Sequence, residues 1–118
     1  MLTYTVDMVQ QQEDNIPQVD VFHAISDPTR RGLLDLVANG EQPVKTLAQA
    51  FAMSRPAISQ HLRILKQAGL VTERRVGREH LYGLQADPLL EVSDWVQHYE
   101  HFWRERLELL SEHLDSTP

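Results

Sequence analysis

The segment from Ser54 to Gln67, SRPAISQHLRILKQ, carries the side chains whose types and spacing most clearly suit a chemical task. Ile58, Leu62 and Leu65 share one face at helical spacing, so the polar residues share the other. Arginine forms paired hydrogen bonds with guanine, and glutamine with adenine, in the major groove of DNA. The segment therefore predicts a helix that reads base edges. Its outward residues are Arg55, Pro56, Ser59, Gln60, Arg63, Lys66 and Gln67.

A second basic group follows this helix. The segments LVTERR and REHLYGL contain β-branched and aromatic residues and predict a hairpin joined at Val76-Gly77, with its register left open. Arg74 and Arg75 precede the tip and Arg78 follows it. Such a hairpin is placed to track phosphates or to enter the adjacent minor groove.

The net charge of −6 at first argues against nucleic acid, because phosphate binding needs Lys and Arg. The distribution of charge reverses that conclusion. Residues 54–80 carry six basic and two acidic side chains, whereas residues 1–53 carry three and seven and residues 81–118 carry two and eight. The basic residues thus gather on the two elements that are expected to face DNA.

Two further residues of this region leave alternatives open. His61 lies at the edge of the apolar face of the helix and is either a structural hydrogen-bonding group or a DNA contact. Tyr82 is expected in the core rather than stacked on a base, because Leu81 and Leu84 belong to the same buried strand. The predicted DNA-binding set is Ser54, Arg55, Pro56, Ser59, Gln60, His61, Arg63, Arg74, Arg75 and Arg78.

The elements that must position these groups begin near the N-terminus. Residues 1–16 are polar without periodicity and predict a flexible arm, and residues 17–118 predict one domain that opens with a short helix near Pro17. Asp27 and the proline after it predict the cap and first turn of a second helix, which Gly40 ends. The first helix is expected to bury Val21, Phe22 and Ile25 on one face, and the second runs through Leu33, Leu34, Leu36 and Val37.

The order helix, tight turn, polar-faced helix and hairpin is typical of a winged helix-turn-helix. The first helix of this motif is expected from Val44 to Phe51. Ser54 is expected to cap the second by accepting a hydrogen bond from the Ala57 N–H, and Gly69 to end it. The predicted fold is mainly α, with about five helices and a small antiparallel hairpin.

The C-terminal segment predicts a long helix that starts at Asp87-Pro88 and carries an apolar stripe. At 1.5 Å per residue it would reach roughly 40 Å, which is long for so small a domain. The stripe is too apolar for the domain to cover by itself, so a two-fold partner is a better interpretation than a ligand pocket. The residues expected at the dimer interface are Phe22, Trp95, Tyr99, Phe102, Trp103, Leu107 and Leu110.

Composition excludes several classes of function. The 118 residues suffice for one domain without a separate catalytic domain, and the lack of cysteine excludes disulfides, thiolate metal ligands and a thiol nucleophile. A histidine-based metal hydrolase would need an acidic and histidine cluster that the sequence does not offer, so neither an enzyme nor a cofactor is expected. No apolar run approaches roughly 20 residues and the N-terminus is unlike a secretory signal, so no membrane association and a cytoplasmic location are expected.

The segments DPTRRGLL, SRPAISQHLRILKQAGLV and GREHLYGL together resemble the ArsR/SmtB-type bacterial repressors. The resemblance covers roughly residues 19–115 and rests on several linked segments in the right order. It implies a dimeric winged-helix repressor whose first and last helices form the dimer interface and whose DNA affinity is lowered by an effector.

This sequence departs from the family at the positions that hold metal ligands in metal-sensing members. Metal-sensing members place a Cys-x-Cys pair before the recognition helix, where this sequence has Pro43 and Lys45. A second family site begins with an Asp-x-His pair on the last helix, but here Asp94 is followed by Val96 two residues on. His98, His101 and His113 are therefore expected to be polar residues on the outside of the helix rather than metal ligands.

The sequence as a whole predicts a transcriptional regulator that binds double-stranded DNA. The expected form is a homodimeric repressor on an inverted-repeat operator, without a metal response through cysteines. The alternative from another class is a winged helix that serves as a protein-interaction module. Such a module needs no basic hairpin. The sequence does not indicate which effector or which operator sequence the protein binds.

Overall fold

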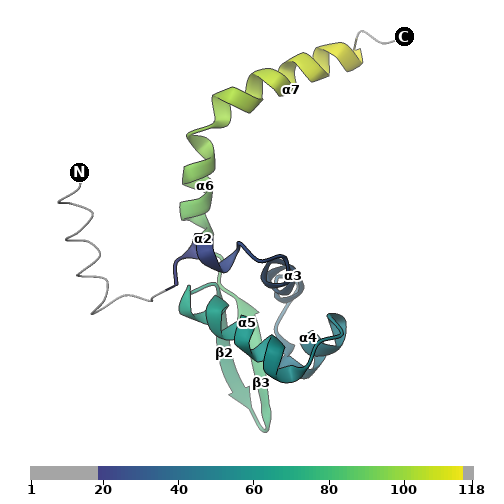
Figure 1. Ribbon diagram of the computed structural model, residues 1–118, viewed down its shortest axis with the longest axis vertical. Helices are drawn as coiled ribbons and strands as arrows, with labels where there is room; N and C mark the ends of the chain where they lie inside the picture. The colour runs from purple at the N-terminus through teal and green to yellow at the C-terminus, as the bar shows by residue number, and fades with distance from the viewer. Residues whose placement is uncertain (1–18, 116–118) are drawn as a thin grey trace, which may run out of the picture.

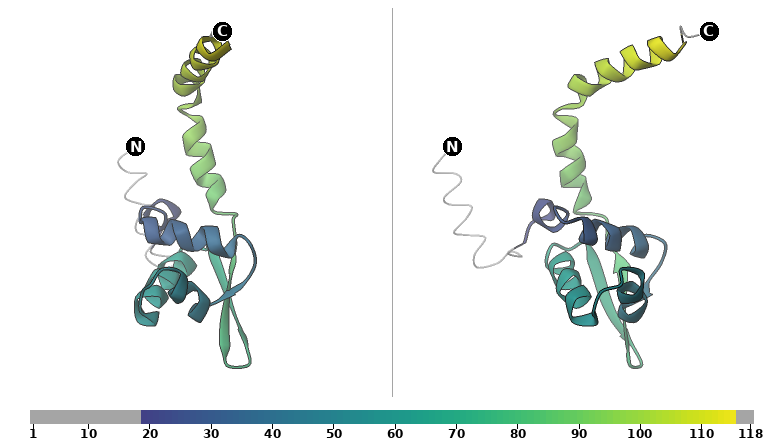
Figure 2. Two further views of the ribbon diagram at one scale, coloured as in Figure 1. Left: turned by 90° about the vertical axis from the view of Figure 1, so that its right-hand side faces the viewer. Right: turned by 45° about the vertical axis from the view of Figure 1, so that its right-hand side comes forward.

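The computed structural model describes residues 19–115 and confirms a mainly helical winged helix-turn-helix (Figure 1). Helices α2 to α5 and a small sheet pack together, α6 contacts α2 and then leads away from them, and α7 lies apart from the core in all views (Figure 2). The predicted arm and the predicted helix start near Pro17 lie outside the described residues. The elements are α2 (Val21–Ala24), α3 (Pro28–Val37), β1 (Gln42–Pro43), α4 (Val44–Ala50), α5 (Arg55–Gln67), β2 (Val71–Val76), β3 (Glu79–Leu84), α6 (Leu89–Gln97) and α7 (Glu100–Asp115).

The caps of α3 and α5 form as predicted. The Asp27 carboxylate accepts from the Arg30 N–H at 3.0 Å, and the Ser54 hydroxyl oxygen accepts from the Ala57 N–H at 3.3 Å. A proline stands in the first turn of each helix, where its missing N–H costs no hydrogen bond. Gly69, with φ +77°, follows the last turn of α5 in the left-handed conformation that favours glycine.

The sheet has three antiparallel strands in the order β1-β3-β2, so the predicted hairpin is confirmed and gains a short third strand. Its register pairs Val71 with Leu84 and Val76 with Glu79. The two residues between the strands are therefore Gly77 and Arg78, and the tip lies one residue later than the predicted Val76-Gly77 join. This correction places Arg78 in the turn itself.

One apolar core joins the sheet to α2 through α5. Leu33, Leu47, Ile58, Leu62 and Leu65 are fully inaccessible to solvent there. Because α5 gives its whole apolar stripe to this core, the opposite side of the helix is held outward with little rotational freedom.

The C-terminal segment is two helices and not the single long one that the sequence predicts. The N–H groups of His98 and Tyr99 bond to carbonyls three residues back, at 3.2 and 2.9 Å, so the chain tightens there and changes direction (Figure 1). Nor does Asp87 cap α6, because that helix begins after Pro88 without a side-chain cap. The apolar spacing continues across the break, which contains no glycine or proline, so periodicity alone could not reveal it.

None of the helices among residues 19–115 is both long and apolar enough to cross a bilayer.

Candidate nucleic-acid interface

Helix α5 presents its predicted polar residues to solvent in two groups. Arg55, Ser59 and Lys66, at steps of four and seven residues, lie along the edge nearer the hairpin, where the first two line a groove against it. Gln60 and Arg63 lie further round the helix and are exposed. The predicted outward face therefore divides into an edge beside the hairpin and a face that is free to enter a DNA groove.

The hairpin beside α5 projects past the helices at its tip (Figure 2). Arg75 lies near the tip, where its Nε donates to the Gly77 carbonyl oxygen at 3.2 Å, and Arg78 occupies the exposed turn. The structure therefore places two of the three predicted hairpin arginines at the end that extends furthest.

Arg74 differs from the other two hairpin arginines. Its Nε and Nη2 donate to both carboxylate oxygens of Glu41, with distances of 2.7 to 3.0 Å. The side-chain hydrogen bond from Arg74 holds the pKa of Glu41 below its usual value. Because strand side chains alternate, Arg74 also lies on the other face of the sheet from Arg75. Its charge is neutralised within the chain.

Glu73 is a functional candidate that sequence reasoning missed. Its carboxylate accepts hydrogen bonds from Lys66 Nζ at 2.7 Å, Tyr82 OH at 2.8 Å and His80 Nδ1 at 2.9 Å. These donors, Lys66 first, hold the pKa of Glu73 below its usual value, while burial and the nearby carboxylate raise the pKa of Tyr82 to about 12. The signal that could have revealed this cluster is strand alternation, which needs the register that the sequence left open.

The predicted core position of Tyr82 is confirmed, because the residue is 8% exposed.

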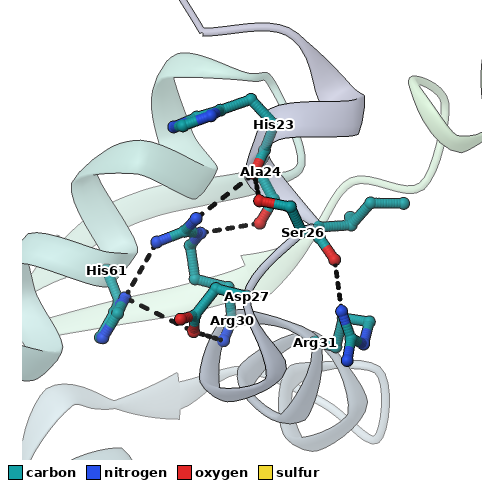
Figure 3. A network of polar contacts seen from close by, with 8 residues as sticks. His23, Ala24, Ser26, Asp27, Arg30, Arg31 and His61 are labelled. Carbon is teal, nitrogen blue, oxygen red and sulfur yellow. Dashed lines mark hydrogen bonds and ion pairs between the residues drawn. The ribbon is translucent and has the colours of Figure 1, made fainter.

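A second network ties α5 to α2 and α3 (Figure 3). The guanidinium of Arg30, a residue only 7% exposed, donates from Nε to the Ala24 carbonyl at 2.7 Å and from Nη2 to the His23 carbonyl at 3.3 Å. Its Nη1 lies 3.2 Å from His61 Nδ1. Since arginine can only donate, that nitrogen of His61 accepts and carries no proton. The structure therefore gives His61 a hydrogen-bond partner, Arg30, as expected if His61 is a structural hydrogen-bonding group.

Six of the seven predicted interface residues form an exposed apolar stripe along α6, α7 and the break between them, and the seventh, Phe22, lies half-buried on α2. Phe22 packs edge-on against Trp95, with ring centroids 5.7 Å apart, and Trp95 packs in the same way against Tyr99. Even so, Trp95 is 52% exposed. The other exposed members are Tyr99, Phe102, Trp103, Leu107 and Leu110.

The comparisons with known proteins agree with this architecture. A model of the bacterial regulatory protein family arsR matches residues 27–73, from the cap of α3 into β2. The transcriptional repressor SdpR of Bacillus subtilis is 41% identical over 80 residues, which make up 68% of this chain and 89% of that repressor. The chain belongs to the ArsR family.

Further members of the ArsR family resemble most of the chain. The HTH-type transcriptional regulator Rv2034 of Mycobacterium tuberculosis is 35% identical over 95 residues, covering 80% of this chain and 86% of that protein. A solved structure described as a possible transcriptional regulator for arsenical resistance is 41% identical, with a TM-score of 0.63, and covers 85% of this chain and 99% of that one. These relatives are regulators and not enzymes, and this chain is a DNA-binding transcriptional regulator.

The described side chains of this ArsR-family chain do not favour the binding of a metal ion. Within residues 19–115 no three histidine or acidic side chains gather closely enough to hold a metal ion. Pro43 and Lys45, which stand where the resemblance implies thiolate ligands in metal sensors, offer no suitable donor. His98 and His101 lie at the break between α6 and α7 and on the first turn of α7.

We therefore expect zinc to leave DNA affinity within about twofold, since among residues 19–115 no cluster of ligands couples the ion to folding or to α5. The measurement is a DNA-binding titration with stoichiometric zinc and with excess chelator. A loss of binding at stoichiometric zinc that the chelator reverses would contradict this and bring His98, His101 and His113 back into consideration as ligands.

Proposed function

We propose that two copies of this chain form a homodimer that binds an inverted-repeat operator and represses transcription. The observation that carries the dimer is the apolar stripe of α6 and α7, whose aromatic residues are about half exposed in a single chain. Contiguous apolar surface of this kind is typical of an interface between subunits. A second copy related by two-fold symmetry would cover it with the same surface.

In this proposal each subunit contributes one recognition helix. Helix α5 enters the major groove with Gln60 and Arg63 toward the base edges, while Arg75 and Arg78 follow the phosphates. Helices α6 and α7 and the hairpin tip lie at opposite ends of the molecule (Figure 1). Dimerisation through α6 and α7 would therefore leave the DNA-facing elements uncovered.

The test is a footprint on the duplex that the protein selects from a random-sequence library. We expect two protected half-sites related by two-fold symmetry, with centres about one helical turn, ~34 Å, apart. Protection of a single half-site at saturating protein would contradict the dimeric arrangement, and failure to select any sequence would contradict operator binding.

The two groups of DNA-facing residues should respond differently to mutation. Gln60→Ala or Arg63→Ala should cost about 1 to 3 kcal/mol on the operator and relax the preference at one base pair, because a base contact discriminates. Arg78→Ala should weaken binding to every sequence alike and reduce the salt slope by about one. Competition binding at two or more salt concentrations measures both quantities.

Arg74→Ala is the matched control for Arg78→Ala, because both remove an exposed hairpin arginine but Glu41 already neutralises Arg74. It should leave the salt slope closer to that of the wild type. Equal changes in slope would show that Arg74 leaves Glu41 to contact DNA.

A further inference from the structure

A groove between α5 and the hairpin, lined by both polar and apolar side chains, lies next to the DNA-facing surface. It has a volume of about 420 Å³, and buried Val44 and Tyr82 contribute to its walls. Arg55 and Ser59 line it from α5, and His80 lines it from β3. All three are exposed, so the groove offers a cation, a hydroxyl and an imidazole at its open side.

Glu73, the carboxylate among the described residues that line the groove, is already neutralised. Glu73 accepts from Lys66, Tyr82 and His80, and these contacts keep it ionised above its lowered pKa. A carboxylate that carries three internal donors repels an incoming anion less than a free one would. It also fixes the ring of His80 in place.

The contact with Glu73 indicates which ring nitrogen of His80 carries a hydrogen. Because ionised Glu73 can only accept, His80 Nδ1 carries the hydrogen of the 2.9 Å contact. In the part of the chain that the structure describes, the other ring nitrogen, Nε2, makes no hydrogen bond. Neutral His80 would present a lone pair there, whereas protonated His80 presents an N–H donor.

The charges that face His80 come from three elements. Glu73 and the cross-strand neighbour Arg75 lie on β2, and the Tyr82 hydroxyl lies two residues on along β3. Arg55 shares the groove from α5, and Lys66, also on α5, is paired with Glu73. Among the described lining residues, α4 contributes Val44, which is uncharged. With Glu73 paired, the remaining charge at the groove is positive.

We propose that this groove binds one phosphate of the operator backbone, and that His80 takes up a proton from solvent on binding so that its Nε2–H donates to a phosphate oxygen. Arg55 and Ser59 bind the same phosphate from α5. This inference rests on the proposed operator binding and adds to it a named phosphate site. It also moves Arg55 from base reading to the backbone.

Proton uptake at one site makes operator affinity depend on pH. Histidine ordinarily titrates between pH 5 and 8, so the complex should gain affinity as the pH falls through that range. One linked proton changes affinity by at most tenfold per pH unit, and we expect about tenfold in total between pH 8 and pH 6.

The experiment measures the affinity of the library-selected duplex at pH 8 and pH 6 at constant ionic strength. His80→Gln should bind at pH 8 within about threefold of the wild type but lose most of the gain at pH 6, because glutamine does not titrate. His98→Gln, which changes an exposed histidine at the α6–α7 break, is the matched control and should keep the gain.

A second measurement uses the unaltered protein. The ring chemical shifts of His80 in the DNA complex at pH 7 should be those of a doubly protonated imidazole. Wild-type affinity that does not change with pH, a gain that His80→Gln retains, or a neutral ring in the complex would each overturn the phosphate site. Failure of the wild type to bind the duplex at either pH would instead overturn the proposed function.

Discussion

Arg30→Met should lower the free energy of unfolding by about 2 to 4 kcal/mol, a large share of the stability of a domain of this size. The guanidinium bonds two carbonyls at the end of α2 and the ring of His61 on α5. Methionine fills a similar volume but donates nothing, so the Ala24 carbonyl loses the donor that contacts it most closely. Urea unfolding at a fixed protein concentration measures the change, since a dimer's stability depends on concentration.

Arg31→Met is the matched control, because it removes a neighbouring arginine that also donates to a carbonyl, that of Ile25 at 2.7 Å, but is exposed. Water can replace its hydrogen bond, so the loss should stay below about 1 kcal/mol. Equal losses for the two variants would show that the buried network contributes nothing beyond an ordinary surface contact.

The parts of the fold that could be predicted from the sequence are those that local chemistry determines. Asp27 and Ser54 accept from N–H groups three residues on, and each precedes a proline or stands near one, so the starts of α3 and α5 follow from a few adjacent residues. The outward side of α5 follows equally from the 3.6-residue period.

The parts that could not be predicted depend on pairings between distant residues. Strand β1 has only two residues and exists because Gln42 and Pro43 meet Tyr82 and Leu81 on β3. The Glu73 cluster likewise requires the strand register and the approach of Lys66 from α5. Neither leaves a periodic signal, so hydrophobic pattern alone gives the correct fold class but an incomplete site.

The largest effect on assembly is expected from Trp103→Ala. Trp103, Leu107, Leu110 and Leu114 recur at steps of four, three and four residues on α7, so they share one face, and each is exposed in the single chain. In the proposed dimer this face is buried, and truncating a large buried aromatic typically costs about 3 kcal/mol or more. The dimer should therefore weaken by about a hundredfold or more. Sedimentation at micromolar concentration measures the change.

The same variant should leave each monomer folded, because the core of the described residues includes none from α7. Its circular dichroism should match that of the wild type, while operator binding becomes steeply dependent on concentration, since one preformed particle no longer presents two recognition helices. Glu112→Ala, on the opposite side of α7, is the control and should remain dimeric. A wild-type monomer, or a Trp103→Ala dimer of unchanged strength, would show that the stripe serves another partner.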